Sequence, residues 1–335
     1  MSPTDVSSIS QDTTLARLAA PVADELASSE QRLEELVPLQ AGSLVATVYR
    51  HVLKAGGKRL RPLLALLSCQ AAGGHAADCV DRAMAVEVLH LSSLVHDDVI
   101  DEASQRRGKP SARQRWGNRT SILVGDFLLA EVTRRLSGGL EQQSLAVMAS
   151  AVSDMCLAEL VEQPTDPAAL TEARYFAHIR GKTASLMAAA CEVGAIAANS
   201  DSARQPLIDY GMNLGQAFQI ADDLLDLYGD AATLGKPVLQ DLSAGQWTLP
   251  LIYALHSADR TSAQQLSRLL VEAVADPAAA RPAAEMAERL GGRRYAEERA
   301  CGLAEQARRA LANLPDTPAR RSLSELADYV VRRQH

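Results

Sequence analysis

The chain has 335 residues, a net charge of −7 and an isoelectric point near 5.6. This acidic balance argues against a nucleic-acid-binding protein, because such proteins need a basic face to replace the counterions on phosphate. Hydrophobic residues make up 47% of the chain but aromatic residues only 4%, which favours helices packed on small side chains over strand-rich sheets.

Apolar residues recur at intervals of three and four along most of the chain, as is typical of amphipathic helices. No segment alternates as a strand, and no linker rich in Pro, Gly or Ser divides the chain. We therefore predict an all-α, single-domain bundle of long helices over 15–335, preceded by a flexible N-terminal tail at 1–14. The predicted helices are 15–38, 42–55, 62–73, 77–101, 119–137, 141–160, 169–179, 184–198, 203–228, 248–256, 261–275, 281–289, 293–313 and 317–333.

Three features predict a soluble, cytoplasmic protein. The five cysteines are scattered and lack the paired spacing of a zinc site, which indicates reduced thiols. The first dozen residues are polar and lack the basic start and apolar core of a secretory signal. The longest nearly apolar stretch, "ASLMAAACEVGAIAA" from Ala184, contains Glu192 and is short for a bilayer span, so we expect no integral membrane segment.

Two similar acidic groups each end a long apolar segment. The motif "HDDVID" is followed 125 residues later (222 − 97) by "ADDLLD". On a helix each motif gathers three carboxylates into one patch, which is unfavourable by roughly 0.2–0.5 kcal/mol per pair unless a cation lies there. A solvated acidic face is the alternative, but two copies after apolar helices favour metal binding. Oxygen ligands select hard cations, so we predict Mg²⁺ at two patches facing one cavity, formed by Asp97, Asp98, Asp101, Asp222, Asp223 and Asp226.

Basic residues gather in four short motifs: "GGKRLRP", "QRRGKP", "RGKTA" and "LGKP". The first suits an exposed loop entering a helix, because two glycines precede the cations and Pro62 follows them. Each motif alone is also consistent with solvated surface charge. Together they offer direct contacts to phosphate, while the aspartates bind phosphate through Mg²⁺, so the sequence suggests two diphosphate substrates.

His90 and Gln219 each lie one or two helical turns before an aspartate patch. Either residue is also consistent with a polar side chain satisfied inside the bundle. Their matched placement favours a role in substrate binding.

These motifs, with "WGNRTSILVGDFLLA", "GKTASL", "QIADDLLD" and "DLSAGQWTLPLI", resemble in order those of the trans-polyprenyl diphosphate synthases. That family elongates an allylic diphosphate with isopentenyl diphosphate. The resemblance covers about Lys54 to Leu255, and the closing "LADYVVRRQH" is similar to longer-chain members. It implies the isoprenoid synthase fold, in which long helices surround a central catalytic cavity, and a homodimer.

The resemblance also implies roles for individual residues. Two or three Mg²⁺ ions per active site are held by Asp97, Asp98, Asp101, Asp222 and Asp223, with Asp226 assisting. Isopentenyl diphosphate is held by Lys58, Arg61, His90 and Arg107, and the allylic diphosphate by Arg106, Lys182, Thr183, Gln219 and Lys236. The first five aspartates and Lys182 are the expected catalytic residues. Two positions depart from the family pattern: Gln246 replaces its usual lysine and Leu239 its usual glycine, which puts efficiency in doubt more than reaction type.

The implied chemistry is ionisation, condensation and proton elimination, with charge on the departing diphosphate neutralised by Mg²⁺, Lys and Arg. Members that stop early tend to carry a bulky aromatic residue four or five positions before the first aspartate. Here those positions are small, with no aromatic further back along the helix, so we predict a medium- to long-chain all-trans product that can bring the protein to membranes. The residues concerned are Ser93, Ser92, Leu89 and Ala85.

Three other readings stay open. The product can be of geranylgeranyl or farnesyl length. A terpene cyclase uses the same ionisation on one substrate, but it does not need the basic "GGKRLRP" loop or a second full acidic motif. The chain can also be a weakly active regulatory subunit of a heteromeric synthase, an idea that Gln246 alone supports.

Overall fold

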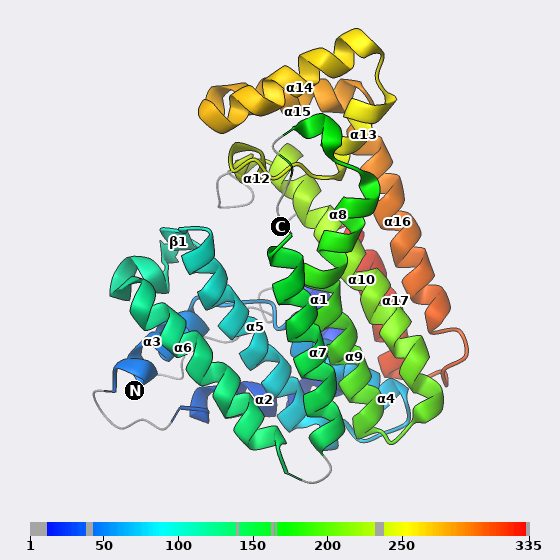
Figure 1. Ribbon diagram of the computed structural model, residues 1–335. Coiled ribbons are helices and arrows are strands. Elements are labelled where there is room, and N and C mark those ends of the chain that lie inside the picture. Colours follow the sequence, from blue (N-terminus) through cyan, green and yellow to red (C-terminus); the bar gives the residue numbers. More distant parts are fainter. Residues whose placement is uncertain are drawn as a thin grey trace. The chain divides into compact units, whose positions relative to one another are not determined.

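The computed structural model describes residues 12–37, 43–138, 141–161, 164, 166–231 and 238–332, and these are almost entirely helical, as predicted (Figure 1). The chain divides into two compact units, which are described separately. The first comprises Met1–Val152, Leu186–Gly211 and Ala310–Leu326, and the second comprises Ser153–Ser185, Met212–Arg309 and Ala327–His335. The single domain predicted for 15–335 stays a prediction. The predicted tail lies mostly outside the described residues, and the first described helix begins at Thr13.

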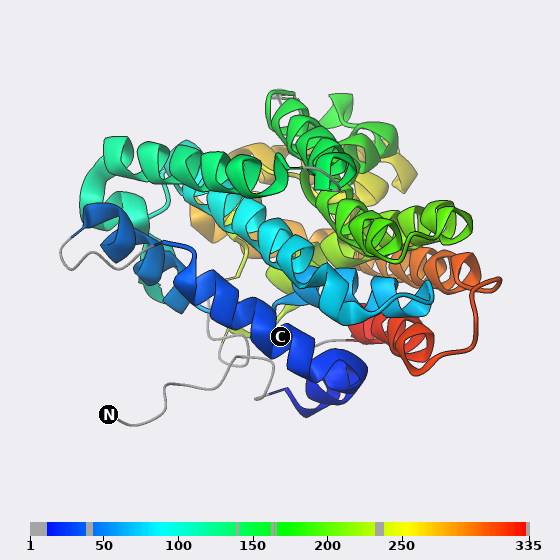
Figure 2. The same ribbon diagram turned by 90° about the horizontal axis from the view of Figure 1, so that it is seen from below.

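The first unit is built around one long buried helix. Helix α5 (Val80–Ile100) packs against α2 (Ala23–Glu35), α3 (Leu44–Lys54), α4 (Leu60–Ala71) and α6 (Ala112–Leu136). Figure 2 shows α5 in cyan between the blue α2 and the teal α6. The unit also contains α1 (Thr13–Ala19), the 3₁₀ turn Ala76–Cys79, most of α7 (Gln142–Glu159) and α9 (Ser185–Ala197), and the first part of α10 (Asp201–Tyr228).

Small residues let these helices approach closely, as the composition predicts. Gly194 of α9 faces α4 so directly that a Cβ atom there would lie 2.5 Å from the carbonyl oxygen of Ala65. Nearly every residue of α4 is buried. The core of the first unit therefore depends on backbone proximity as well as on large side chains.

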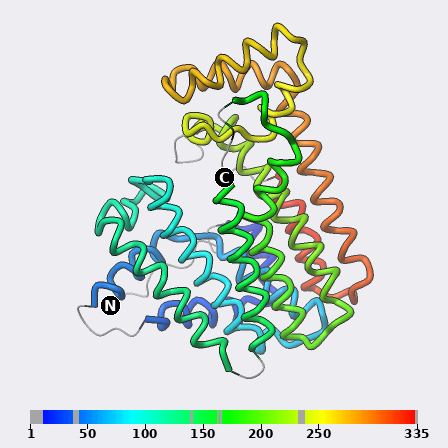
Figure 3. Tube along the Cα trace, viewed as in Figure 1, coloured from blue at the N-terminus to red at the C-terminus, as the bar shows by residue number. Residues whose placement is uncertain are grey.

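The second unit combines the end of α10 with the C-terminal helices. Figure 3 shows the trace of α14 (Arg260–Ala275) turning back on itself into α15 (Ala280–Arg289), which it packs against. The other elements are α8 (Glu172–Ile179), a π-helical turn (Arg180–Ala184), α12 (Gln240–Ser243), α13 (Leu249–Ser257), α16 (Gly292–Ala310) and the end of α17 (Pro318–Arg332).

Several details of the predicted secondary structure were wrong: α6 begins at Ala112 rather than at 119, and α12 was not predicted. The single helix predicted over 15–38 is interrupted by a 3₁₀ turn at Ala20–Val22, because Pro21 has no N–H to donate within a helix. The absence of strands was also wrong, since β1 (Gln105–Arg106) pairs antiparallel with β2 (Lys109–Pro110). Arg107 and Gly108 both have positive φ, 52° and 73°, which suits the tight turn of a hairpin. No helix in the described part of the chain is long and apolar enough to cross a membrane.

Candidate active site

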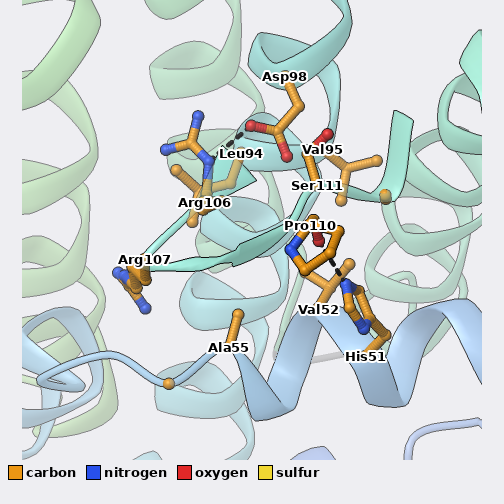
Figure 4. Close-up of a pocket in the computed structure, with 12 residues that line it drawn as sticks. His51, Val52, Ala55, Leu94, Val95, Asp98, Arg106, Arg107, Pro110 and Ser111 are labelled. Carbon is orange, nitrogen blue, oxygen red and sulfur yellow. Dashed lines mark hydrogen bonds and ion pairs between the residues drawn. The ribbon is translucent and has the colours of Figure 1, made fainter. Parts of the chain in front are cut away.

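The first aspartate patch lies at the end of α5. Asp98 is only 4% exposed, and Nε of Arg106 donates to its Oδ1 at 2.6 Å (Figure 4). Burial raises the pKa of Asp98, and the charge of Arg106 opposes that rise. Asp97 is half-buried, and Asp101 is exposed at the helix end, where its N–H donates to the carbonyl of Asp97 at 2.8 Å. Arg106 thus contacts the patch itself.

The β1–β2 hairpin returns the chain to the basic loop after α3. Lys109 Nζ donates to the carbonyl of Lys54 at 2.5 Å, and His51 Nε2 donates to the carbonyl of Pro110 at 2.8 Å. At Gly57 a Cβ atom would lie 2.7 Å from Nη1 of Arg107. The guanidinium can move, but Gly57 also has a φ of 155°, which residues with a side chain rarely adopt, so glycine is favoured at this point.

His90 lies within the resulting cluster of positive charge. Burial lowers its pKa well below the ordinary value, and the charges of four arginines lower it further: Arg61, Arg107, Arg106 and Arg59. Burial also lowers the pKa of Arg61 to about 10. A neutral histidine among arginines offers hydrogen bonds without adding charge, and the surrounding field attracts an anion.

The second aspartate patch, in the second unit, is held by a chain of hydrogen bonds. Thr183 Oγ1 donates to Oε1 of Gln219 at 2.7 Å, and Nε2 of Gln219 donates to Oδ1 of Asp223 at 2.9 Å. Tyr175, which the sequence did not single out, donates its hydroxyl to Oδ2 of Asp223 at 2.6 Å. Burial raises the pKa of Asp223 well above its usual range, and the charge of Asp241 adds to this rise.

Asp226, the third aspartate, fixes the start of the short helix α12. Its Oδ1 accepts from the backbone N–H of Gln240 at 3.2 Å, and its Oδ2 accepts from that of Asp241 at 3.1 Å. Its carbonyl accepts from the N–H of Leu239 at 2.8 Å. Leu239 precedes α12 in the left-handed region, with φ 63° and ψ 22°, where glycine is favoured. The departure noted in the sequence therefore has a conformational cost.

Asp241 is a fourth acidic residue at this patch that sequence reasoning missed. It stands in the quoted motif "DLSAGQWTLPLI", which was the available signal. Gln246, the other departure, is exposed, and its N–H donates to the carbonyl of Asp241 at 2.8 Å.

The remaining predicted cations are differently placed. Lys182 lies in the π-helical turn and forms an ion pair with Glu159. Such turns are rare and frequently occur at functional sites. Lys58 is half-buried in the loop before α4. Lys236 lies outside the described residues.

The four residues predicted to set chain length all lie on α5, and they differ in how far they are buried. Ser92 is 1% exposed, and its hydroxyl donates to the carbonyl of Gly125 on α6 at 2.9 Å. Ser93 is half-buried and donates to the carbonyl of His90 at 2.9 Å. Leu89 and Ala85, one and two turns before Ser93, are buried. Ser92 is therefore packed against α6, and Ser93 is the more accessible of the two serines.

The acidic residues suit a hard cation by donor type, since carboxylate oxygens dominate both patches. Within the described residues, however, no group of three or more His, Cys, Asp or Glu side chains is placed to hold a metal ion. The three carboxylates predicted at each patch therefore do not form a metal site by themselves. Mg²⁺ commonly uses only one or two carboxylates, with water and substrate phosphate as its other ligands.

The fold is almost entirely helical, and aspartates of both units are held by hydrogen bonds. The family model for polyprenyl synthetase matches residues 43–287. The chain therefore belongs to the polyprenyl synthetase family, and it is a prenyltransferase. This confirms the resemblance and the fold inferred from the sequence.

Individual relatives cover most of the chain. It is 37% identical to the octaprenyl diphosphate synthase of Escherichia coli K12, over 84% of this chain and 88% of that protein. It is 36% identical to heptaprenyl diphosphate synthase component 2 of Geobacillus stearothermophilus (94% and 97%), and 34% identical to a short chain isoprenyl diphosphate synthase of Methanothermobacter thermautotrophicus (92% and 96%). The crystal structure of a decaprenyl diphosphate synthase from Rhodobacter capsulatus matches with a TM-score of 0.87 at 36% identity, over 96% of this chain and 99% of that one.

Proposed function

We propose that this protein condenses an allylic diphosphate with isopentenyl diphosphate to give a medium- to long-chain all-trans polyprenyl diphosphate. The observation that carries the proposal is the cluster of arginines around neutral His90, beside the first aspartate patch in the same compact unit. An acid patch alone would suit ionisation of one substrate. A cation cluster next to it supplies a second, metal-independent place for diphosphate.

The reaction proceeds in three steps: ionisation, condensation and proton elimination. The allylic C–O bond breaks, and diphosphate leaves with the bonding electrons. The double bond of isopentenyl diphosphate then forms a C–C bond to the allylic cation, which leaves a new carbocation. The carbon next to this carbocation loses a proton to the released diphosphate, and the C–H electrons form the new double bond. Mg²⁺, when bound, neutralises charge on the departing diphosphate. No protein nucleophile is required.

The chain's own residues divide the binding between them. The aspartates of both patches hold two or three Mg²⁺ ions, with Asp226 assisting from the start of α12. Support comes from their oxygen-only chemistry and from the hydrogen bonds that orient Asp98, Asp223 and Asp226. Isopentenyl diphosphate is held by Lys58, Arg61, His90 and Arg107, and the allylic diphosphate by Arg106, Lys182, Thr183, Gln219 and Lys236.

The growing chain runs along α5, away from the aspartates. The small, half-buried Ser93 and the aliphatic residues behind it support a tail longer than fifteen carbons. The octaprenyl and decaprenyl synthases among the relatives support the same range, whereas the short chain relative marks the alternative.

The protein acts as a cytoplasmic homodimer in this proposal. Ile122 and Leu123 on α6 are 42% and 57% exposed, and a second copy of the chain would cover such adjacent apolar side chains. Its partners are the two diphosphate substrates, with no nucleic acid.

The proposal is tested by incubating the purified protein alone with isopentenyl diphosphate, Mg²⁺ and, in turn, dimethylallyl, geranyl or farnesyl diphosphate. Mass analysis of the products should show a ladder of five-carbon additions that ends beyond twenty carbons. A product that ends at fifteen or twenty carbons would leave the reaction in place and overturn the chain length.

A second candidate function is that of one subunit in a two-component synthase. The observation that favours it is the similarity to a protein named as component 2 of a heptaprenyl diphosphate synthase. The same assay separates the two candidates, because a subunit of this kind would turn over slowly by itself and a complete enzyme would not.

A further inference from the structure

Arg59 stands between Lys58 and Arg61 in the basic loop but has a different environment from both. It is 8% exposed and precedes α4 in the left-handed region, with φ 46° and ψ 35°. This conformation is unfavourable for a residue with a Cβ atom, so the surroundings must hold it in place.

Groups from three helices hold the Arg59 side chain. Its Nη1 donates to Oε1 of Glu87 on α5 at 2.8 Å, and its Nη2 donates to the carbonyl of Leu53 on α3 at 3.3 Å. Its Nε lies 3.5 Å from Oε1 of Glu30 on α2. Glu87 is itself only 3% exposed. The buried guanidinium of Arg59, the residue that precedes α4, thus links the start of α4 to α2, α3 and α5.

This link involves close neighbours of the cation cluster. Glu87 is one helical turn before His90 on α5, and Arg61 is two residues after Arg59. The charge of Glu87 acts on Arg61, and that of Arg59 acts on His90. At Gly57 a Cβ atom would lie 3.3 Å from Nη1 of Arg59, so the loop folds closely over this side chain.

We propose that Arg59 and Glu87 are positioning residues, which fix the basic loop so that Lys58, Arg61 and His90 form one site for the diphosphate of isopentenyl diphosphate. Arg59 does not contact that substrate, because its side chain is buried and its charge is already matched by two carboxylates. This inference rests on the proposed function, which assigns isopentenyl diphosphate to these residues.

The decisive variant removes both buried charges at once. Arg59→Met with Glu87→Leu keeps the volume similar and removes both fully buried charges together, so that only Glu30, whose side chain is 29% exposed, loses an ion pair. Replacing a buried ion pair by apolar residues of similar volume is a change that proteins often tolerate. A matched control is available on the same helix: Arg82 is also buried and pairs with Glu141 at 3.0 Å, in a part of the first unit assigned no substrate. The control is therefore Arg82→Met with Glu141→Leu.

Binding of isopentenyl diphosphate is measured by isothermal titration calorimetry without metal or allylic substrate, together with steady-state kinetics and thermal unfolding. We expect the Arg59/Glu87 double variant to raise the Kd and the KM for isopentenyl diphosphate by about tenfold, the scale on which supporting residues act. The KM for the allylic substrate should change by less than about twofold, which is much less than the rise expected for isopentenyl diphosphate. The control should leave both Michaelis constants unchanged, whatever it does to the melting temperature.

Single variants keep the inference testable if the double variant fails to fold. Arg59→Lys retains the charge but loses the two-pronged contact, and Glu87→Gln retains an acceptor but loses the charge. Each should weaken binding of isopentenyl diphosphate selectively. Unchanged affinity in folded variants, or equal loss for both substrates, would overturn the positioning role. If the wild-type protein binds no isopentenyl diphosphate, the proposed function fails instead.

Discussion

The hydroxyl of Tyr175 donates a 2.6 Å hydrogen bond to Oδ2 of Asp223, and both side chains are buried. The other oxygen of this carboxylate accepts from Gln219, so the carboxylate plane is fixed from two sides. Tyr175 comes from α8 and Asp223 from α10, 48 residues apart in sequence. The orientation of the second aspartate patch therefore depends on a residue far from its own motif.

Replacing Tyr175 by Phe should weaken the binding of metal by the enzyme rather than destabilise its fold. We expect the Mg²⁺ concentration for half-maximal activity, and the Kd for Mn²⁺ measured by electron paramagnetic resonance, to rise about tenfold, as is usual for residues that orient metal ligands. Tyr210→Phe is the control, because its buried hydroxyl donates at 2.7 Å to the carbonyl of Leu323 and touches neither patch. Equal metal affinities in the two variants would contradict the prediction.

Leu239 should be less favourable than glycine at its own position. Leu239→Ala and Leu239→Gly both remove the side chain, but only glycine relieves the left-handed backbone, so the glycine variant should be more stable by about 1 kcal/mol in urea unfolding. Leu157, which is exposed on the regular helix α7, provides the control. There the Leu157→Gly variant should be less stable than Leu157→Ala by about the same amount. The same order at both positions would show that the conformation of Leu239 carries no cost.

His90 should make the protein less stable in mild acid. Its pKa is lowered in the folded state, so below about pH 6.5 the unfolded chain takes up a proton that the folded protein does not. The free energy of unfolding should fall as the pH falls from 6.5, by up to about 1.4 kcal/mol over one pH unit. His90→Gln should remove this part of the pH dependence. Urea denaturation of the wild type, His90→Gln and the control His75→Gln, which changes an exposed histidine, gives the free energy of unfolding at pH 7.5, 6.5 and 5.5. If this free energy depended on pH in the same way in all three proteins, the prediction would be refuted.

Chain length should respond more cleanly to Ser93 than to Ser92. A phenylalanine at Ser92 must displace the backbone of α6 at Gly125 and should destabilise the protein by about 1–3 kcal/mol. At the half-buried Ser93 the ring has more room, so Ser93→Phe should stay folded and shorten the longest product. Mass analysis of products from both variants checks this, and an unchanged distribution with Ser93→Phe would show that the tail does not pass this residue.

Local patterns predicted most of the helices well because apolar residues recur along them at helical spacing. The helix predicted over 261–275 is α14, Arg260–Ala275, and that predicted over 77–101 contains α5, Val80–Ile100. Pro21 itself indicated the interruption, because proline has no N–H to donate within a helix. The regular apolar spacing on both sides nevertheless led to the prediction of a single helix.

The site residues were predictable as types and spacings, but their partners were not. The pairing of Arg106 with Asp98 depends on a hairpin whose turn places Arg107 at positive φ, which no apolar period signals. The Tyr175 contact spans two helices, so only the fold reveals it. The same holds for the burial of Ser92, because the sequence does not say which neighbour faces which side of α5.

Diphosphate release under matched conditions tests the central claim most directly. Metal-assisted condensation of two substrates predicts one diphosphate released for each isopentenyl diphosphate consumed. It predicts no sustained release from the allylic substrate alone, and none in EDTA or after Asp97→Ala or Asp222→Ala, because each change weakens charge neutralisation on the leaving group. Sustained release from the allylic diphosphate without isopentenyl diphosphate, or undiminished turnover in EDTA, would contradict the account.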